Sequence, residues 1–254
     1  MRLSGGSIPS KAVCKAVTNF GSPERYNDMT NELQQFVTAE TLTDANFESL
    51  YDVISKERMD TYLVAAGYDK PRAAKLYIWN ALIGEAFHIP IQAVEVALRN
   101  RINHALIARY GNEWWDHGRF QNVIDIDRKS DLELVRRRIR NRKLPLGNGQ
   151  IVAGLSFGFW VGMLQKRYNP DLWSSHLQTS FPHLPPDRSR KSLADEVAKI
   201  ATLRNRISHH EPLINRNLSD DHSRITRTLG WLCPVKQAWV APYSRVPALL
   251  RQKP

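Results

Sequence analysis

Residues 70–110 read KPRAAKLYIWNALIGEAFHIPIQAVEVALRNRINHALIARY. Apolar side chains recur in this stretch at steps of three and four residues, the spacing that places them on one face of an α-helix. Proline lacks an amide hydrogen and disfavours the helical conformation of the residue before it. We therefore predict two helices here, the first starting at Lys70-Pro71 and stopping before Pro90, the second running on to Tyr110 and ending at Gly111.

The same helical spacing recurs along most of the chain, with proline and glycine between the segments. The other expected helices are 30–38, 44–54, 56–66, 130–142, 151–168, one that starts at Ser189 or Ser192 and ends before Pro212, and 220–232. No alternating run of β-branched residues exceeds a few positions, so we predict an all-α fold. We expect a flexible polar extension over residues 1–28, one helical domain over 29–235, and a proline-punctuated tail over 236–254.

The 254-residue chain is strongly basic, with a net charge of +11. Residues 1–127 carry 13 lysines and arginines against 16 acidic residues, whereas residues 128–254 carry 23 against 9, so the whole excess belongs to the second half. Such asymmetry favours a polyanionic partner, and RNA is the one we expect, although a merely soluble surface has the same composition.

The two cysteines and the apolar runs bear on where the protein acts. Cys14 and Cys233 form neither a disulfide framework nor a cysteine zinc site, which fits a reducing cytoplasm. The first thirty residues contain no apolar core of signal-peptide length. The longest apolar run, residues 151–164, is shorter than a bilayer requires, so we expect no membrane association.

Two hexapeptides a hundred residues apart match at five of six positions: RNRINH at 99–104 and RNRISH at 204–209. Each combines an arginine, whose rigid fork of donors grips phosphate, with a histidine that titrates near neutrality. These are the groups needed to hold a phosphodiester and move its protons. We take the second copy, with Arg204, Asn205 and His209, as the candidate catalytic site for RNA cleavage.

On a helix, Asn205 and His209 share a face, whereas Arg204 lies about 140° around the axis from His209. One hexapeptide is therefore half a site, and we expect Arg99, Asn100 and His104 to form a possible second half. The structural alternative is that Arg204 is a surface charge and that His209 caps the helix end, where positive charge interacts favourably with the dipole. Glu95, four residues before Arg99, could likewise hold that arginine in a helix ion pair.

Further residues are candidates for RNA contact or for metal binding. Trp114 and Trp115 could line a track for the RNA backbone. The His209-His210-Glu211 sequence resembles part of a metal cluster, but adjacent histidines diverge by about 100° on a helix, so we expect no metal and no other cofactor. The expected RNA-binding side chains are Arg206, His210, Arg136, Arg137, Arg138 and Arg140.

The order of motifs resembles that of the bacterial Abi-like family of abortive-infection proteins (AbiD/AbiF type), within the HEPN superfamily. The resemblance covers about residues 30–235. It rests on the stretch 57–63, LYIWN at 76–80, EVALRN at 95–100, IVAGLSFGFW at 151–160, Trp173, Phe181-Pro182, and LRNRISHHEP at 203–212.

The resemblance implies a HEPN-like helical bundle, here with additional N-terminal helices. It also implies a metal-independent endoribonuclease of phage defence or of a toxin–antitoxin system. The family's Arg-x4-His motif falls on Arg204 and His209, with Asn205 as the polar residue that follows the arginine. Attack of the ribose 2′-OH would leave 2′,3′-cyclic phosphate ends, and DNA would be refused because it lacks that hydroxyl.

Partners follow from the same resemblance. HEPN nucleases commonly pair two such helices across a homodimer, whereas here Arg99 and His104 of the same chain offer an intrachain alternative. An RNA or protein antitoxin is a further expected partner. The competing hypothesis is a noncatalytic RNA-binding or regulatory HEPN module in a defence complex, for which arginine and lysine contacts to phosphate would suffice.

Overall fold

The computed structural model describes residues 44–174 and 176–254. The predicted extension 1–28 and the predicted helix 30–38 lie outside these residues. The chain divides into two compact units, residues 1–55 and residues 56–254. All regular elements of the described residues are helices, so the prediction of an all-α fold is confirmed for them.

In the first unit the described element is α2, Asp44–Ile54, where a helix was predicted. Phe47 is buried and its ring centroid lies 6.1 Å from that of Tyr51. The longer helices of the second unit are α3 (Lys56–Ala65), α4 (Lys70–Tyr110), α6 (Ile126–Asn141), α10 (Arg190–Ser208) and α11 (Leu218–Leu232). The shorter ones are η1 (Trp114–Asp116), α5 (Gly118–Val123), α7 (Asn148–Gly154), α8 (Phe157–Gly162), η2 (Lys166–Tyr168), η3 (Asn169–Trp173), α9 (Leu177–Ser180), α12 (Pro234–Val240), η4 (Ala241–Tyr243) and α13 (Val246–Arg251).

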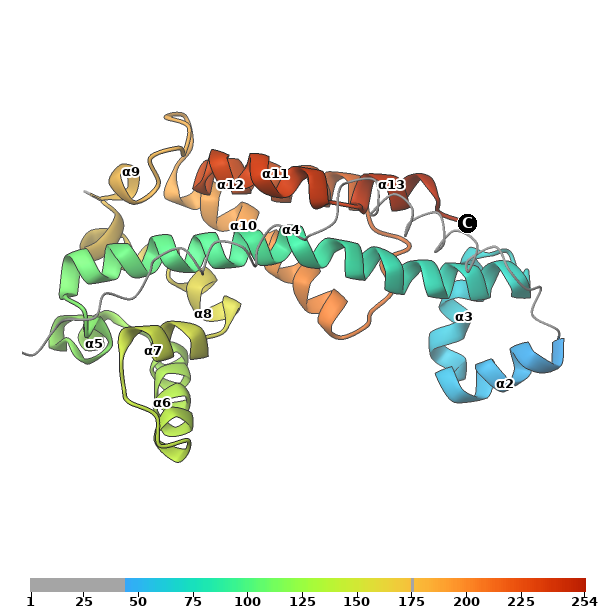
Figure 1. The fold of residues 1–254 in the computed structure, drawn as a ribbon, viewed down its shortest axis with the longest axis horizontal. Helices are drawn as coiled ribbons and strands as arrows, with labels where there is room; N and C mark the ends of the chain where they lie inside the picture. Colours follow the sequence, from blue (N-terminus) through green and yellow to red (C-terminus); the bar gives the residue numbers. More distant parts are fainter. Residues whose placement is uncertain (1–43, 175) are drawn as a thin grey trace, which may run out of the picture. The chain divides into compact units, whose positions relative to one another are not determined.

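The second unit is built on α4, which runs beside α11 and α13 (Figure 1). Asp69 caps its first turn by accepting a hydrogen bond from the Arg72 backbone N–H at 2.9 Å, and Gly111, at φ +87°, ends it. The predicted break at Pro90 is wrong, because α4 continues through this residue as one helix of 41 residues. By length and composition α4 could cross a membrane, but half of its apolar stretch is buried, as in the core helix of a globular protein.

An aromatic cluster packs beside the C-terminal part of α4. Trp114 is fully buried, and its ring contacts Trp115, Phe120, Phe159 and Trp160 at centroid distances of 5.2 to 6.3 Å, mostly edge to face. Trp115 is 1% exposed. The expectation that these two tryptophans line an RNA track is therefore wrong, because neither ring can reach a base.

The apolar stretch 151–168, predicted as one helix, is divided between α7, α8 and η2. Ser156 interrupts it, because its hydroxyl accepts a hydrogen bond from the Phe159 N–H at 3.2 Å and so caps a new helix. Gly154 lies so close to α6 that a β-carbon there would stand 2.6 Å from a methyl group of Val135. The glycine thus permits the approach of α7 to α6.

Two segments form more helix than the sequence predicted. α6 begins at Ile126 rather than 130, because Asp125 accepts the Arg128 N–H at 3.0 Å. Residues 236–254, predicted as a tail, contribute to α12 and form α13, and both helices contact α4. The Trp79 indole donates a hydrogen bond to the carbonyl of Leu249 on α13 at 2.8 Å.

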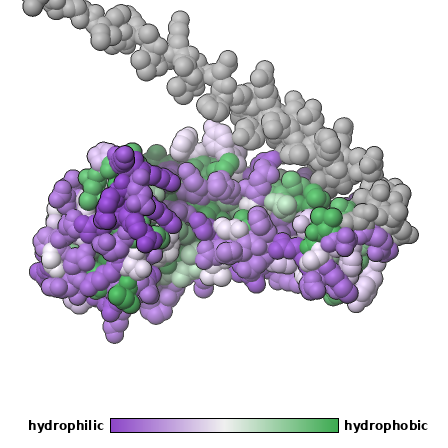
Figure 2. Space-filling model, turned by 90° about the horizontal axis from the view of Figure 1, so that it is seen from below, coloured by the Kyte–Doolittle hydropathy of each residue, from purple (hydrophilic) through white to green (hydrophobic). Residues whose placement is uncertain are grey.

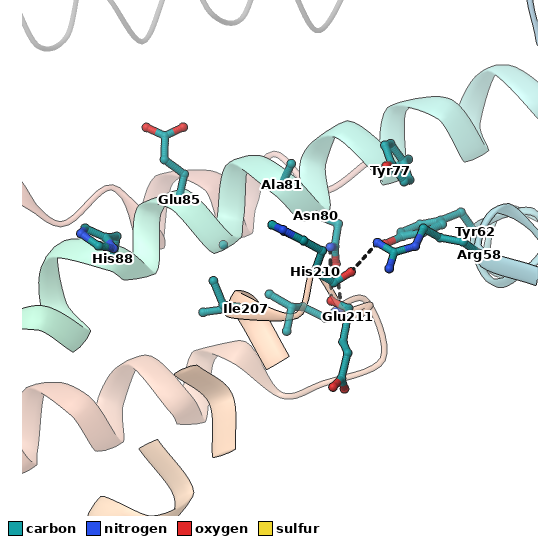
Figure 3. Close-up of a pocket in the computed structure, with 12 residues that line it drawn as sticks. Arg58, Tyr62, Tyr77, Asn80, Ala81, Glu85, His88, Ile207, His210 and Glu211 are labelled. Atoms are coloured by element: carbon teal, nitrogen blue, oxygen red, sulfur yellow. Dashed lines mark hydrogen bonds between the residues drawn. The ribbon is translucent and has the colours of Figure 1, made fainter. Parts of the chain in front are cut away.

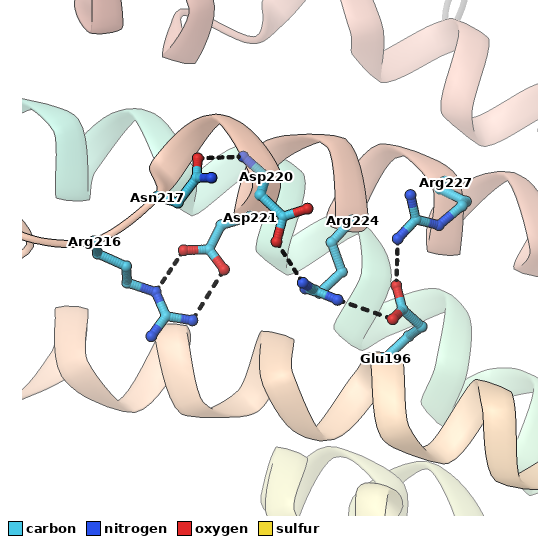
Figure 4. A network of polar contacts seen from close by, with 7 residues as sticks. All are labelled: Glu196, Arg216, Asn217, Asp220, Asp221, Arg224 and Arg227. Atoms are coloured by element: carbon cyan, nitrogen blue, oxygen red, sulfur yellow. Dashed lines mark hydrogen bonds and ion pairs between the residues drawn. The ribbon is translucent and has the colours of Figure 1, made fainter.

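A charged network joins α10 to α11 (Figure 4). Arg224, on α11, has a side chain that is 10% exposed and donates to Glu196 of α10 at 2.8 Å and to Asp220 at 2.6 Å. Arg227 reaches the second oxygen of Glu196 at 2.6 Å, but its side chain is 46% exposed. Solvent screens an exposed ion pair, whereas a buried charge that loses its partner has no water to replace it.

We expect Arg224→Ala to lower the free energy of unfolding by about 3 kcal/mol, because it leaves one oxygen of the largely buried Glu196 carboxylate without its partner. The matched variant Arg227→Ala should cost less than about 1 kcal/mol. Urea denaturation of both variants measures the difference. Equal losses would show that burial does not distinguish the two pairs.

A second prediction concerns His222, which lies between α4 and the C-terminal segment. Its Nε2 is 3.0 Å from the Ser244 hydroxyl, and its ring faces Phe87. Burial lowers the pKa of His222 below its ordinary 6.5. The unfolded chain therefore binds a proton that the folded chain excludes, and stability falls as the pH drops below about 6.5. In His222→Gln this loss between pH 7 and pH 5 should shrink, as urea denaturation at each pH would show.

Candidate functional site

The C-terminal end of α10 carries the second hexapeptide and terminates abruptly. Ser189 and Ser192 form a capping box at its start, and His209 is its C-cap. His210 follows in the left-handed conformation, at φ +55°, so the chain turns back and the Glu211 N–H reaches the carbonyl of Arg206 at 2.9 Å. This turn ends the helix before Pro212, where the sequence predicted the stop.

The turn is held against α4 by side-chain hydrogen bonds (Figure 3). The buried amide of Asn80 accepts the Leu213 N–H at 2.6 Å and donates to the carbonyl of Glu211 at 3.4 Å. Arg58 of α3 donates to the carbonyl of His210 at 2.9 Å. α3, α4 and the residues after α10 therefore meet at one place, and their side chains enclose two adjoining hollows.

The first hollow, which we call the arginine groove, has a volume of about 470 Å³ and lies between α4 and α10. It brings together Arg99 and Arg204, the leading arginines of the two hexapeptides. Its lining residues are His88, Ile91, Gln92, Glu95, Val96, Arg99, Arg204, Ile207 and Ser208. Each arginine donates to the asparagine that follows it, Arg99 to Asn100 and Arg204 to Asn205, both at 3.4 Å. The donor is Nε in Arg99 and a terminal nitrogen in Arg204.

The charge in the arginine groove suits an anion. Two guanidinium groups and the single carboxylate of Glu95 line it. The expected ion pair between Glu95 and Arg99 does not form among the described residues, so that pair does not explain why Arg99 is there. Burial lowers the pKa of Lys236 on α12, and the nearby charge of Arg99 lowers it further. Lys236 does not itself line the groove.

The second hollow, which we call the tyrosine pocket, has a volume of about 640 Å³. Its lining residues are Arg58, Tyr62, Tyr77, Asn80, Ala81, Gly84, Glu85, His88, Ile207, His210, Glu211 and Leu213 (Figure 3). Burial raises the pKa of Tyr62 to about 12, with a smaller contribution from Tyr77, so its hydroxyl stays protonated near neutral pH. Tyr62 can therefore donate a hydrogen bond there but cannot act as a base.

His88 and Ile207 line both hollows, which therefore adjoin. Along α4 their lining residues follow each other at helical spacing from Tyr77 to Arg99, so both open on one face of that helix. At 1.5 Å per residue this face extends over about 33 Å. A break at Pro90 would have separated the two hollows.

The other predicted catalytic residues lie at the edge of the arginine groove or away from it. Asn205 and His209 are exposed, and His209 stands between Ser208, which lines the groove, and His210, which lines the tyrosine pocket. His104 lines a third cavity, of about 300 Å³, together with Arg101, Arg109 and His176. Arg99 and His104 thus face different cavities, and the histidine of α4 that lines the arginine groove is His88.

The predicted RNA-binding residues divide in the same way. Arg206 forms an ion pair with Glu211 at 3.0 Å, and His210 lines the tyrosine pocket. Arg136 pairs with Asp116 and Glu133, whereas three other arginines of α6 are exposed: Arg137, Arg138 and Arg140. Figure 2 shows a strongly hydrophilic surface at the end of the unit where α6 lies. None of the α6 arginines lines either hollow.

Sequence reasoning missed two residues that the fold brings to the hollows. His88 was overlooked because it precedes the proline at which a helix end was expected. Tyr77 was assigned to an apolar face, although it is half-buried and lines the tyrosine pocket. The spacing of Tyr77, His88 and Arg99 on an uninterrupted helix is the signal that could have found both.

Comparisons with family models, curated proteins and solved structures find no match to this chain.

Anion binding by the arginine groove can be tested without assuming a reaction. Pyrophosphate should raise the unfolding temperature of the protein, because a ligand that binds the folded state alone stabilises it. We expect Arg99→Gln and Arg204→Gln each to reduce this increase by at least half. Lys191→Gln, an exposed cation in an ion pair at the other end of α10, should keep it. An increase that is the same in all four proteins would place the anion elsewhere.

Proposed function

We propose that this protein is a metal-independent endoribonuclease that cleaves RNA by attack of a ribose 2′-OH on the adjacent phosphorus. The observation that carries the proposal is that Arg99 and Arg204, from helices far apart in sequence, line one groove. Arginine donates in a planar fork that matches phosphate oxygens, and two such groups would balance the charge that develops on a pentacoordinate phosphorus.

The reaction needs a base for the 2′-OH and an acid for the 5′ oxygen that leaves. His209 lies at the end of α10, five residues after Arg204, and His88 is the histidine of α4 that lines the arginine groove. One neutral and one protonated imidazole would together move both protons and would give a bell-shaped dependence of rate on pH. Asn205, which accepts from Arg204, is positioned to orient that arginine.

The biological setting of the proposal rests on sequence resemblance. The motifs that resemble the Abi-like family support a HEPN-type bundle, a role in phage defence or a toxin–antitoxin system, and a cytoplasmic site of action. The exposed position of His209 supports a homodimer as well, because a second copy could reach it. RNA would be the substrate, and an RNA or protein antitoxin the partner that restrains the enzyme.

A noncatalytic RNA-binding or regulatory module in a defence complex is the second candidate function. One observation favours it: both arginines line the groove, whereas His209 does not. Phosphate contacts alone need no imidazole, so such a module would keep its salt-dependent affinity for RNA after His209 is replaced. Cleavage separates the two candidates.

The decisive experiment incubates the purified protein with total RNA in EDTA and analyses the fragment ends. We expect cleavage with 2′,3′-cyclic phosphate ends. His209→Ala and His88→Ala should each slow cleavage by about 10²–10⁴-fold, and Arg204→Ala and Arg99→Ala by about 10²–10³-fold. Lys191→Ala is the matched control and should cleave at the rate of the unchanged protein.

Three outcomes would count against the nuclease. Undiminished cleavage by His209→Ala would remove that residue from the mechanism. Fragments without cyclic phosphate would exclude attack by the 2′-OH. Salt-sensitive RNA binding without any cleavage would favour the noncatalytic module.

A further inference from the structure

We propose that the tyrosine pocket binds one unstacked nucleobase of the RNA strand whose phosphate lies in the arginine groove. The inference rests on the proposed function, because it takes the arginine groove as the phosphate site. It goes further in assigning the neighbouring hollow to a base, and hence in predicting that the protein distinguishes RNA by the base next to the bound phosphate.

The size and lining of the pocket fit this ligand. Its volume of about 640 Å³ falls within the range of small-molecule sites. Proteins that bind single-stranded RNA stack splayed-out bases on aromatic side chains and on histidine. Tyr77 and His210 supply such flat groups from α4 and from the turn after α10.

The position of the Tyr77 ring is defined by its neighbour. Tyr62 is 1% exposed, and its ring meets that of Tyr77 edge to face, at a centroid distance of 5.3 Å and an angle of 76°. A fixed, half-buried ring loses little conformational freedom when a base stacks on it. Tyr77 is therefore preorganised, whereas Tyr62 serves as its support.

Small residues leave the space that a base would occupy. Ala81 is exposed and Gly84 is buried on the same face of α4. A β-carbon at Gly84 would stand 3.5 Å from a methyl group of Ile207, so the end of α10 approaches α4 closely at this point. Ile207 and Leu213 provide an apolar surface, and the Arg58 guanidinium provides donors for the acceptor atoms at the edge of a base.

The tyrosine pocket lies next to the arginine groove, as the base of a nucleotide lies next to its phosphate. His88 and Ile207 line both, so no wall of other residues separates a base in the pocket from a phosphate between Arg99 and Arg204. A strand lying along this face of α4 would place its backbone at the arginines and direct one base towards Tyr77. The bound base would in turn help to align the 2′-OH with the phosphorus.

The test compares binding of inorganic phosphate and of the four nucleoside 3′-monophosphates to the full chain by calorimetry. We expect at least one nucleotide to bind about tenfold more tightly than phosphate, as stacking of one base would provide. Tyr77→Ala should remove this gain and leave phosphate affinity unchanged, whereas Tyr77→Phe should retain it. Arg204→Gln should weaken phosphate and nucleotide alike.

A second variant is needed because Tyr77→Ala could also lose nucleotide affinity through a packing defect. Ala81→Trp, at an exposed helical position that lines the pocket, places a bulky ring in the space of the base while Tyr62 and Tyr77 stay in place, and it should also abolish the gain due to the base. The inference is overturned if no nucleotide binds more tightly than phosphate, or if Ala81→Trp binds nucleotides as the unchanged protein does. A gain due to the base without RNA cleavage would refute the nuclease and keep the base site. RNA cleavage without such a gain would keep the nuclease and refute the base site.

Discussion

The continuity of α4 through Pro90 is the constraint on which the site depends. An internal proline removes one helical hydrogen bond and costs about 3 kcal/mol. On both sides of it, Phe87, Ile91, Val94 and Leu98 are almost completely buried. Full burial of each such side chain is worth about 1.5–3 kcal/mol, so packing outweighs the cost of the proline. The helix therefore continues through Pro90, and the face next to its buried one carries an unbroken row of lining residues from Tyr77 to Arg99.

The turn after α10 lines the tyrosine pocket, and Asn80 ties this turn to α4. This one buried amide bonds two backbone groups of the turn, at Glu211 and Leu213. An unsatisfied backbone group at such a place would cost about 1–3 kcal/mol, so the amide ties the turn to α4. The same turn places His210 in the lining of the tyrosine pocket, so Asn80 helps to position that side chain.

The predictions from sequence succeeded where the signal was local. The helical period, the Lys70-Pro71 start, the cap at Ser189 and the glycine at the end of α4 predicted the main helices and many of their ends. They were wrong at Pro90, at Ser156 and in the C-terminal segment. At Pro90 and in the C-terminal segment, packing against distant elements decided the outcome: burial of α4 in the unit and the packing of α13 on α4. At Ser156 the cause is local, because the hydroxyl caps a new helix.

The sequence by itself determined an all-α chain, a basic second half and two Arg-Asn-x-x-x-His stretches, because composition and helical periodicity are properties of neighbouring residues. Only the tertiary structure decided that Arg99 and Arg204 share a groove, that His104 faces another cavity, and that His88 takes its place beside the arginines. The reason is geometric. Which side chains meet depends on the angle and register of helices a hundred residues apart, and these are set by the packing of the whole unit.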